Sequence, residues 1–102
     1  MKKPIVLAGK SGSGKTRLAK LIAHSSNHVS MVLAPTLLKA QDLSVFKNEF
    51  VIVEECSGPS QIIALRDILT KADAKACVFT TQYEITPNAL IGFDVFILTP
   101  KN

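Results

Sequence analysis

The sequence contains few of the residues that define several common protein classes. It has two cysteines, Cys56 and Cys77, which are too few for a disulfide framework, and no second Cys or His pair stands at zinc-ligand spacing. Tryptophan is absent and tyrosine occurs once, at Tyr83. With only two arginines as well, a conventional aromatic and arginine hot-spot interface is not visible. We expect both cysteines to be reduced thiols in or near the core.

Long hydrophobic runs are missing too, and neither sign of charge dominates. No stretch approaches the roughly 20 apolar residues of a membrane-spanning helix. The apolar run after Lys2 and Lys3 ends at Lys10, too early for a signal peptide, so we expect a cytoplasmic protein that does not enter a membrane. Lys and Arg number 12 against 8 Asp and Glu, a net charge of +4. This permits a phosphate-bearing partner such as nucleic acid without requiring one.

What the sequence does contain is typical of one α/β domain. Its 102 residues are 47% hydrophobic and 20% charged, which indicates a single folded unit over residues 1–102. Short, continuous apolar runs predict strands at residues 5–8, 29–33, 50–53, 76–79 and 95–98. Because these runs do not alternate with polar residues, we expect a parallel sheet covered by helices on both faces.

Helical patterns fill the segments between these strands. Leu18, Leu21 and Ile22 lie on one stripe and predict a helix over residues 14–24. A second helix is expected over residues 60–72, after the breaker sequence at 57–59. The pattern between Thr36 and Lys47 is poorer and favours one short helix with Thr36 near its N-cap.

The most specific motif is the run Gly9-Lys10-Ser11-Gly12-Ser13-Gly14-Lys15-Thr16, which matches the P-loop pattern between a predicted strand and a predicted helix. Glycines allow backbone N–H groups to surround a phosphate at the positive end of the helix dipole. Lys15 would bridge the β- and γ-phosphates, and the Thr16 hydroxyl would bind Mg²⁺. We expect Arg17 near the phosphates or on the helix surface. The alternative is an ordinary Gly/Ser turn with a solvated lysine.

Acidic and polar residues end two further predicted strands. Glu54 and Glu55 follow a buried run at 50–53, and Thr80-Thr81-Gln82 follows 76–79. Ligands of α/β sheets bind beyond the carboxyl ends of strands, so both groups should lie beside the P-loop. Since adjacent strand residues point opposite ways, Glu54 would steady the Mg²⁺ shell and Glu55 would orient or deprotonate water. Otherwise these residues form a solvated acidic turn and ordinary strand ends.

The remaining charged residues give weaker signals. We expect His24 and His28 to be surface residues. Scattered lysines, Lys2, Lys3, Lys71 and Lys75, would form either a nucleic-acid patch or a solvated face. Arg66 would either reach a neighbour's nucleotide in an oligomer or make a surface ion pair.

With these motifs the chain resembles a reduced P-loop NTPase of the branch with an additional catalytic glutamate, which holds AAA+ ATPases and viral superfamily 3 helicases. Residues 9–16 correspond to Walker A, 50–55 to Walker B, 78–82 to sensor 1 and 87–98 to the approach to the fifth strand. The Glu-Glu pair is closer to superfamily 3 helicases than to AAA+ proteins. The resemblance implies a three-layer αβα fold, with a mainly parallel five-stranded sheet of order 2-3-4-1-5. It also implies ATP and Mg²⁺ as ligands, and catalytic roles for Lys15, Glu55 and Gln82.

Departures from the family are as informative as the matches. Gln82 stands where the family usually has Asn, and no Arg follows it, so the usual arginine finger is missing. An arginine finger contributes about 10³ to 10⁵ in rate in related phosphoryl transfer, so we expect slow hydrolysis. The helical lid that follows the fifth strand is not expected in this sequence, which ends at Asn102.

Three functions are compatible with these features. The first is a small phage-type Mg²⁺-ATPase that acts on nucleic acid or a protein partner, alone or as a homo-oligomer. The second is a nucleotide-dependent switch, or a subunit of a larger ATPase, that hydrolyses ATP negligibly. The third is a small-molecule kinase, which the length disfavours because a kinase needs an acceptor pocket and a closing lid.

Overall fold

A computed structural model describes residues 1–100, and within them the chain forms a five-stranded sheet. The strand pairs of this sheet are all parallel, and the strand order is β2-β3-β4-β1-β5. Both the α/β class and the predicted order are therefore confirmed. The strands are β1 (Ile5–Ala8), β2 (Val29–Leu33), β3 (Phe50–Cys56), β4 (Ala76–Thr81) and β5 (Asp94–Ile97).

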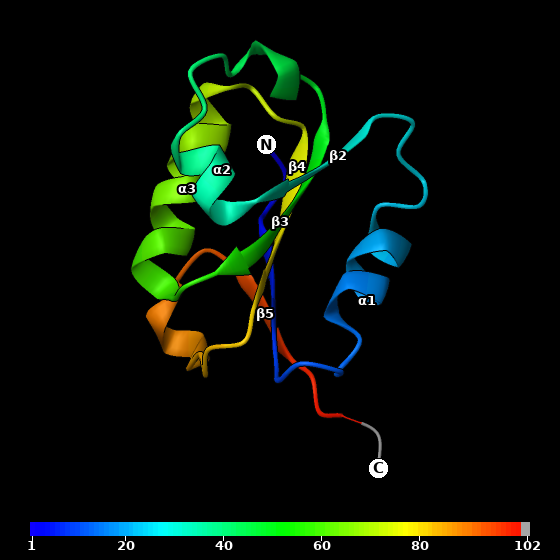
Figure 1. Cartoon of the computed structure of the whole chain (residues 1–102), viewed down its shortest axis with the longest axis vertical. Helices are drawn as coiled ribbons and strands as arrows, with labels where there is room; N and C mark the ends of the chain where they lie inside the picture. Colours follow the sequence, from blue (N-terminus) through cyan, green and yellow to red (C-terminus); the bar gives the residue numbers. More distant parts are fainter. Residues whose placement is uncertain (101–102) are drawn as a thin grey trace.

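Helices lie on both faces of the sheet. Figure 1 shows α1 (Lys15–Ile22) on one side, and α2 (Ala34–Leu38) and α3 (Pro59–Lys71) on the other. Strand order explains this division. The connection from β1 to β2 runs toward the β2 edge of the sheet, and every later connection runs toward the β5 edge. Because such crossovers are right-handed, the first falls on one face and the later ones fall on the opposite face.

The sheet separates two clusters of buried side chains. Val6, Val51 and Phe79 belong to the larger cluster under α2 and α3, whereas Leu7 and Ile52 belong to the smaller one under α1. Every residue of β4 is buried. The prediction of strands covered on both faces is thus confirmed for the central strands, and it is wrong for the two edge strands.

The edge strands are exposed because α1 is too narrow to cover its face of the sheet. A helix is about 10 Å across, whereas five strands at roughly 4.8 Å spacing extend well beyond it. Residues 29, 31 and 33 of β2 are 41–48% exposed, and Phe96 of β5 is 50% exposed. Apolar composition alone therefore overestimated how deeply these strands are buried.

Element boundaries differ from the predictions at particular residues. Thr36 lies inside α2 and not at its cap, because the helix begins at Ala34 with Pro35 in its first turn. The predicted segment 36–47 also contains a separate 3-10 turn, η1 (Ser44–Phe46), and a second turn, η2 (Pro87–Ala89), precedes β5. Strand β3 continues to Cys56, so Glu54 and Glu55 lie within the strand and do not follow it. No helix among residues 1–100 is long and apolar enough to span a membrane.

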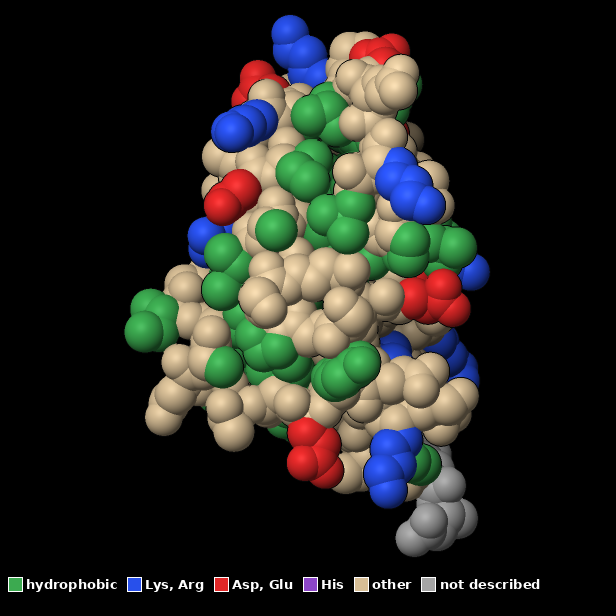
Figure 2. Space-filling view, turned by 60° about the vertical axis from the view of Figure 1, so that its left-hand side comes forward, with side chains coloured by type: hydrophobic (Ala, Val, Ile, Leu, Met, Phe, Trp, Pro, Cys, Tyr) green, Lys and Arg blue, Asp and Glu red, His purple; other side chains and the backbone are tan. Residues whose placement is uncertain are grey.

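The face that carries α2 and α3 has mixed charge. Figure 2 shows Lys and Arg side chains scattered over it, with Asp and Glu between them and small groups of hydrophobic side chains. A continuous basic stripe is not visible on this face. The predicted lysine patch gains no support from this view.

Candidate functional site

The glycine loop, residues 9–14, connects β1 to α1 at the carboxyl edge of the sheet. Gly14 caps α1 with a φ of 87°, a left-handed conformation that favours glycine. Gly9 is required for a different reason. A Cβ atom on Gly9 would lie 2.6 Å from the Leu98 carbonyl oxygen, because the loop starts directly against the end of β5. The loop therefore needs glycine both for its conformation and for its packing.

The Lys15 side chain folds back over this loop. Its Nζ donates hydrogen bonds to the carbonyl oxygens of Gly9 at 2.6 Å and Lys10 at 2.9 Å, and to Ser13 Oγ at 3.4 Å. Partial burial lowers the pKa of Lys15 below the ordinary lysine value. The ammonium group thus lies against the carbonyl oxygens of the loop, at the N-terminal end of α1.

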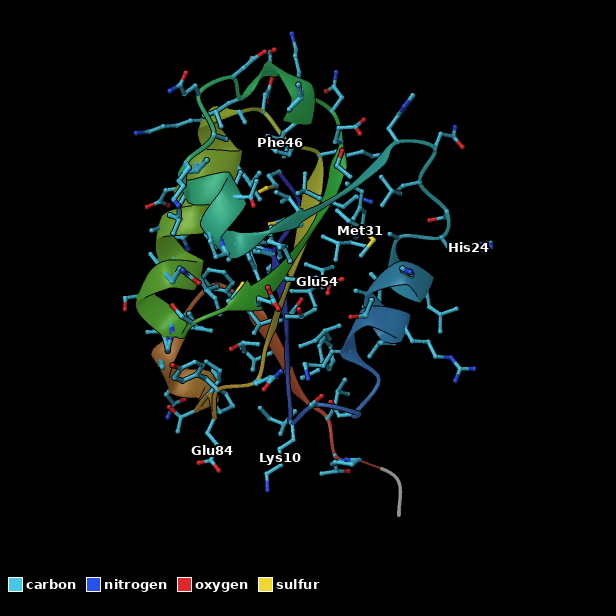
Figure 3. The ribbon with its side chains drawn as sticks, viewed as in Figure 1. Lys10, His24, Met31, Phe46, Glu54 and Glu84 are labelled. Carbon is cyan, nitrogen blue, oxygen red and sulfur yellow. The ribbon has the colours of Figure 1, made fainter. Side chains whose placement is uncertain are left out.

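Thr16 and Glu54 meet across the gap between α1 and β3. The Thr16 hydroxyl donates to Glu54 Oε2 at 3.2 Å. The other carboxylate oxygen, Glu54 Oε1, is buried and has no hydrogen-bond partner within the described part of the chain. Figure 3 shows Glu54 pointing from the sheet toward the side on which α1 lies. A buried carboxylate oxygen without a partner is costly, so this position is suited to a cation or a hydrogen-bond donor.

A β-bulge changes the direction of the second glutamate. Val53 pairs with Phe79 and Cys56 with Thr81, so Glu54 and Glu55 together stand opposite one residue of β4. Glu55 has a φ of 60°, in the left-handed region. The expectation that the two carboxylates point to opposite faces assumed a regular strand; the bulge interrupts the alternation at these two residues, and both line one pocket.

The polar end of β4 has two roles. Thr81 is structural: its hydroxyl donates to the Cys56 carbonyl at 2.8 Å and accepts from the Tyr83 N–H at 3.1 Å. Its own carbonyl accepts from the Gly9 N–H at 3.1 Å, which ties β4 to the glycine loop. Thr80 and Gln82 stand on either side of it and both line the pocket.

These groups enclose one pocket of about 420 Å³ between the loop, the start of α1 and the ends of β3 and β4. Most predicted site residues line it, but Gly9, Lys10 and Ser13 do not. Figure 3 shows Lys10 pointing away from the sheet. The pocket is lined by Ser11, Gly12, Gly14, Lys15, Thr16, Arg17, Glu54, Glu55, Thr80, Thr81 and Gln82.

Sequence reasoning missed a second hollow. It has a volume of about 720 Å³ and lies beside the start of the loop, where Gly9 and Lys10 contribute to its wall. Ala8 and residues 82–86 and 97–100 form the rest of the wall. The signal in the sequence was weak, because Ile85 and Ile97 resemble ordinary core positions.

Residues outside the pocket settle several smaller expectations. Both cysteines are free and buried, and both histidines are exposed. Arg66 does not line the pocket: its guanidinium lies 5.0 Å from the centre of the Phe93 ring and pairs with Asp67 at 3.2 Å. The ion pair expected for Arg66 is therefore present, and contact with a neighbour's nucleotide in an oligomer stays a prediction.

Comparisons with known proteins assign no family. No protein-family model matches the chain, and no curated protein matches it at a significant level.

Proposed function

We propose that the chain is a minimal P-loop NTPase core that binds Mg²⁺·ATP and hydrolyses it slowly, in the manner of AAA+ ATPases and superfamily 3 helicases. The proposal rests on one observation: positively and negatively charged groups line the same pocket. Lys15 and the N-terminus of α1 stand opposite Glu54 and Glu55. A polyphosphate needs the first pair, and a divalent cation with a reacting water needs the second.

The phosphates would be held by the glycine loop. Its backbone N–H groups, the N-terminal end of the α1 dipole and the Lys15 ammonium all favour a multiply charged anion. Lys15 would exchange its bonds to the carbonyls of Gly9 and Lys10 for bonds to phosphate oxygens. Arg17 adds a second positive charge to the wall of the same pocket.

The donor set fits Mg²⁺ that arrives with the nucleotide. No cluster of three or more His, Cys, Asp or Glu residues that could hold a metal occurs in residues 1–100. Mg²⁺ bound to phosphates needs only one or two protein oxygens, since it keeps several waters. Thr16 Oγ1 and the unpartnered Oε1 atom of Glu54 would supply such oxygens. When bound, the ion would neutralise charge on the phosphates.

Glu55 and Gln82 would act on the attacking water. Both line the pocket, and Glu55 is exposed to solvent, so it can accept a proton and release it again. Hydrolysis is expected to be slow, because no arginine follows Gln82 to act as a finger and Arg66 packs on Phe93 outside the pocket lining. The same observation supports a second candidate: a switch or ATPase subunit that hydrolyses only when a nucleic acid or protein partner supplies the missing cation.

The test is Mg²⁺·ATP binding and phosphate release per chain over a wide range of protein concentration. Lys15→Ala should abolish binding. Lys10→Ala, in the same loop but outside the pocket wall, should leave it nearly unchanged. Glu55→Gln should keep ATP and lose turnover if the chain is an ATPase, and should change neither property if it is a switch. Equal binding by the wild type and the Lys15→Ala variant, or no binding by either, would refute the proposal.

A further inference from the structure

The outer edge of β2 is open. This strand is the last in the sheet on its side, and Figure 1 shows it across the front of the molecule with no other element drawn over it. Val29, Met31 and Leu33 occupy alternate positions, so their side chains share one face. Their partners on β3 include Phe50 and Ile52, which belong to the cluster under α1.

This stripe continues the apolar face of the sheet beyond the reach of α1. Val29, Met31 and Leu33 are 41%, 48% and 47% exposed. Figure 3 shows Met31 projecting from β2 toward the side on which α1 lies. The stripe is thus a partly solvated extension of a buried layer.

The backbone of β2 presents hydrogen-bonding groups at the same edge. The Phe50 N–H donates to the His28 carbonyl, so His28 and the residues that alternate with it face β3. Val29 and Met31 therefore direct their own N–H and C=O groups outward, and Leu33 directs its N–H outward, whereas the Leu33 C=O accepts the first hydrogen bond of α2. These are the residues that also carry the apolar stripe.

Edge strands are usually protected by a charge, a proline or a bulge. The β2 sequence Val-Ser-Met-Val-Leu contains no charge and no proline, and its pairing with β3 runs in unbroken register. The opposite edge differs. Strand β5 begins at Asp94, which forms an ion pair with Lys3 at 3.1 Å and places charge on that edge. Protection is missing at β2.

We propose that β2 pairs with β2 of a second copy of this chain, antiparallel and about a two-fold axis at Met31. The two sheets would then form one continuous sheet across the dimer. This proposal concerns a surface outside the pocket and does not depend on the proposed ATPase activity.

A second copy fits this edge because the strand is complementary to itself. With the axis at Met31, Val29 meets Leu33 of the other copy and Met31 meets Met31. Each contact joins two apolar side chains on one face, with no charged residue opposed. The Met31 pair can exchange both hydrogen bonds, and in each Val29–Leu33 pair the Leu33 N–H can donate to the Val29 carbonyl.

The size of the contact predicts how strong the dimer is. A five-residue strand buries less than the roughly 1,200 to 2,000 Å² of standard stable interfaces. We therefore expect a dimer that forms at micromolar to millimolar protein and dissociates on dilution.

The first test is sedimentation equilibrium over that concentration range. Wild type should move from monomer to dimer, and Met31→Lys should weaken association at least tenfold because two ammonium groups would meet at the axis. Ile91→Lys is the matched control, since Ile91 is 87% exposed and lies outside the strand. A monomer at every concentration, or a dimer that tolerates Met31→Lys, overturns the proposal.

A cross-link gives a second readout that does not rely on a charged variant. Residues in a hydrogen-bonded antiparallel pair lie about 5.5 Å apart at Cα, within disulfide range. Met31→Cys should form a covalent dimer under mild oxidation, whereas Val45→Cys, at a 60% exposed position on η1, should not. Burial raises the pKa of both native thiols to about 12, so Cys56 and Cys77 should stay unreactive. Equal cross-linking of the two variants would overturn the pairing.

Discussion

Glu54 should reduce the stability of the ligand-free protein. Its Oε1 atom is buried without a partner among residues 1–100, while Oε2 accepts from Thr16 at 3.2 Å. Leaving a buried charged oxygen unpaired costs about 1 to 3 kcal/mol. Glu54→Gln keeps the shape and the contact to Thr16 but replaces the charged oxygen by a neutral one. We expect the free energy of unfolding to rise by about 1 kcal/mol, or roughly 4 to 8 °C in melting temperature for a domain of this size.

The assay is thermal unfolding followed by circular dichroism, in chelator and without nucleotide. Glu49→Gln is the matched control, because Glu49 Oε1 already accepts from Ser30 Oγ at 2.8 Å. The free energy of unfolding of that variant should fall by about 0.5 to 1.5 kcal/mol, because the hydrogen bond from Ser30 no longer ends on a charged oxygen. If Glu54→Gln destabilises the protein as much as Glu49→Gln does, the Oε1 atom is not an unpaired charge and the reasoning fails. The Glu54→Gln variant should also lose the gain in ATP affinity that Mg²⁺ provides.

Two further predictions concern the glycine loop. Gly9→Ala should lower the free energy of unfolding by about 1 to 3 kcal/mol in a denaturant titration, since its Cβ would lie 2.6 Å from the Leu98 carbonyl oxygen. The control Ser11→Ala, in the same loop, should leave the free energy of unfolding unchanged. Because burial lowers the pKa of Lys15, ATP affinity should fall as the pH rises toward the ordinary lysine pKa of 10.5. The free energy of unfolding of the ligand-free protein should rise over the same pH range, because the native state releases the Lys15 proton at a lower pH than the unfolded state does. Lys15→Arg, which stays charged, should remove the loss of affinity in a pH series of binding isotherms, and an unchanged pH profile would contradict this.

The sequence predicted the parts of this protein that depend on short-range pattern. Continuous apolar runs located the sheet, and the glycine loop followed directly from its spacing between a strand and a helix. The strand order came from the resemblance and not from the pattern. The exposure of Met31 was not predictable, because its burial depends on the width of α1 and on the place of β2 at the edge.

The candidate site shows the same division. Lys15, Thr16 and Glu54 were identified by residue type and position, and the structure brings them into one pocket. The direction of Glu55 was not predictable, since a bulge depends on how β3 pairs with β4 and not on residue type. Thr81 was expected beside the phosphates, yet its hydroxyl is committed to the Cys56 carbonyl. This hydrogen bond could not be predicted, because it depends on the pairing of β3 with β4.

Thr81 also determines how much order the pocket already has before a ligand arrives. Its side chain fixes the end of β3, and its backbone carbonyl fixes the first residue of the glycine loop. The separation between the glycine loop and the carboxylates is therefore set by the folded backbone, and a ligand would not have to organise it. Binding would then need to reposition only the side chains of Lys15 and Glu54, so little conformational entropy is lost when the site fills.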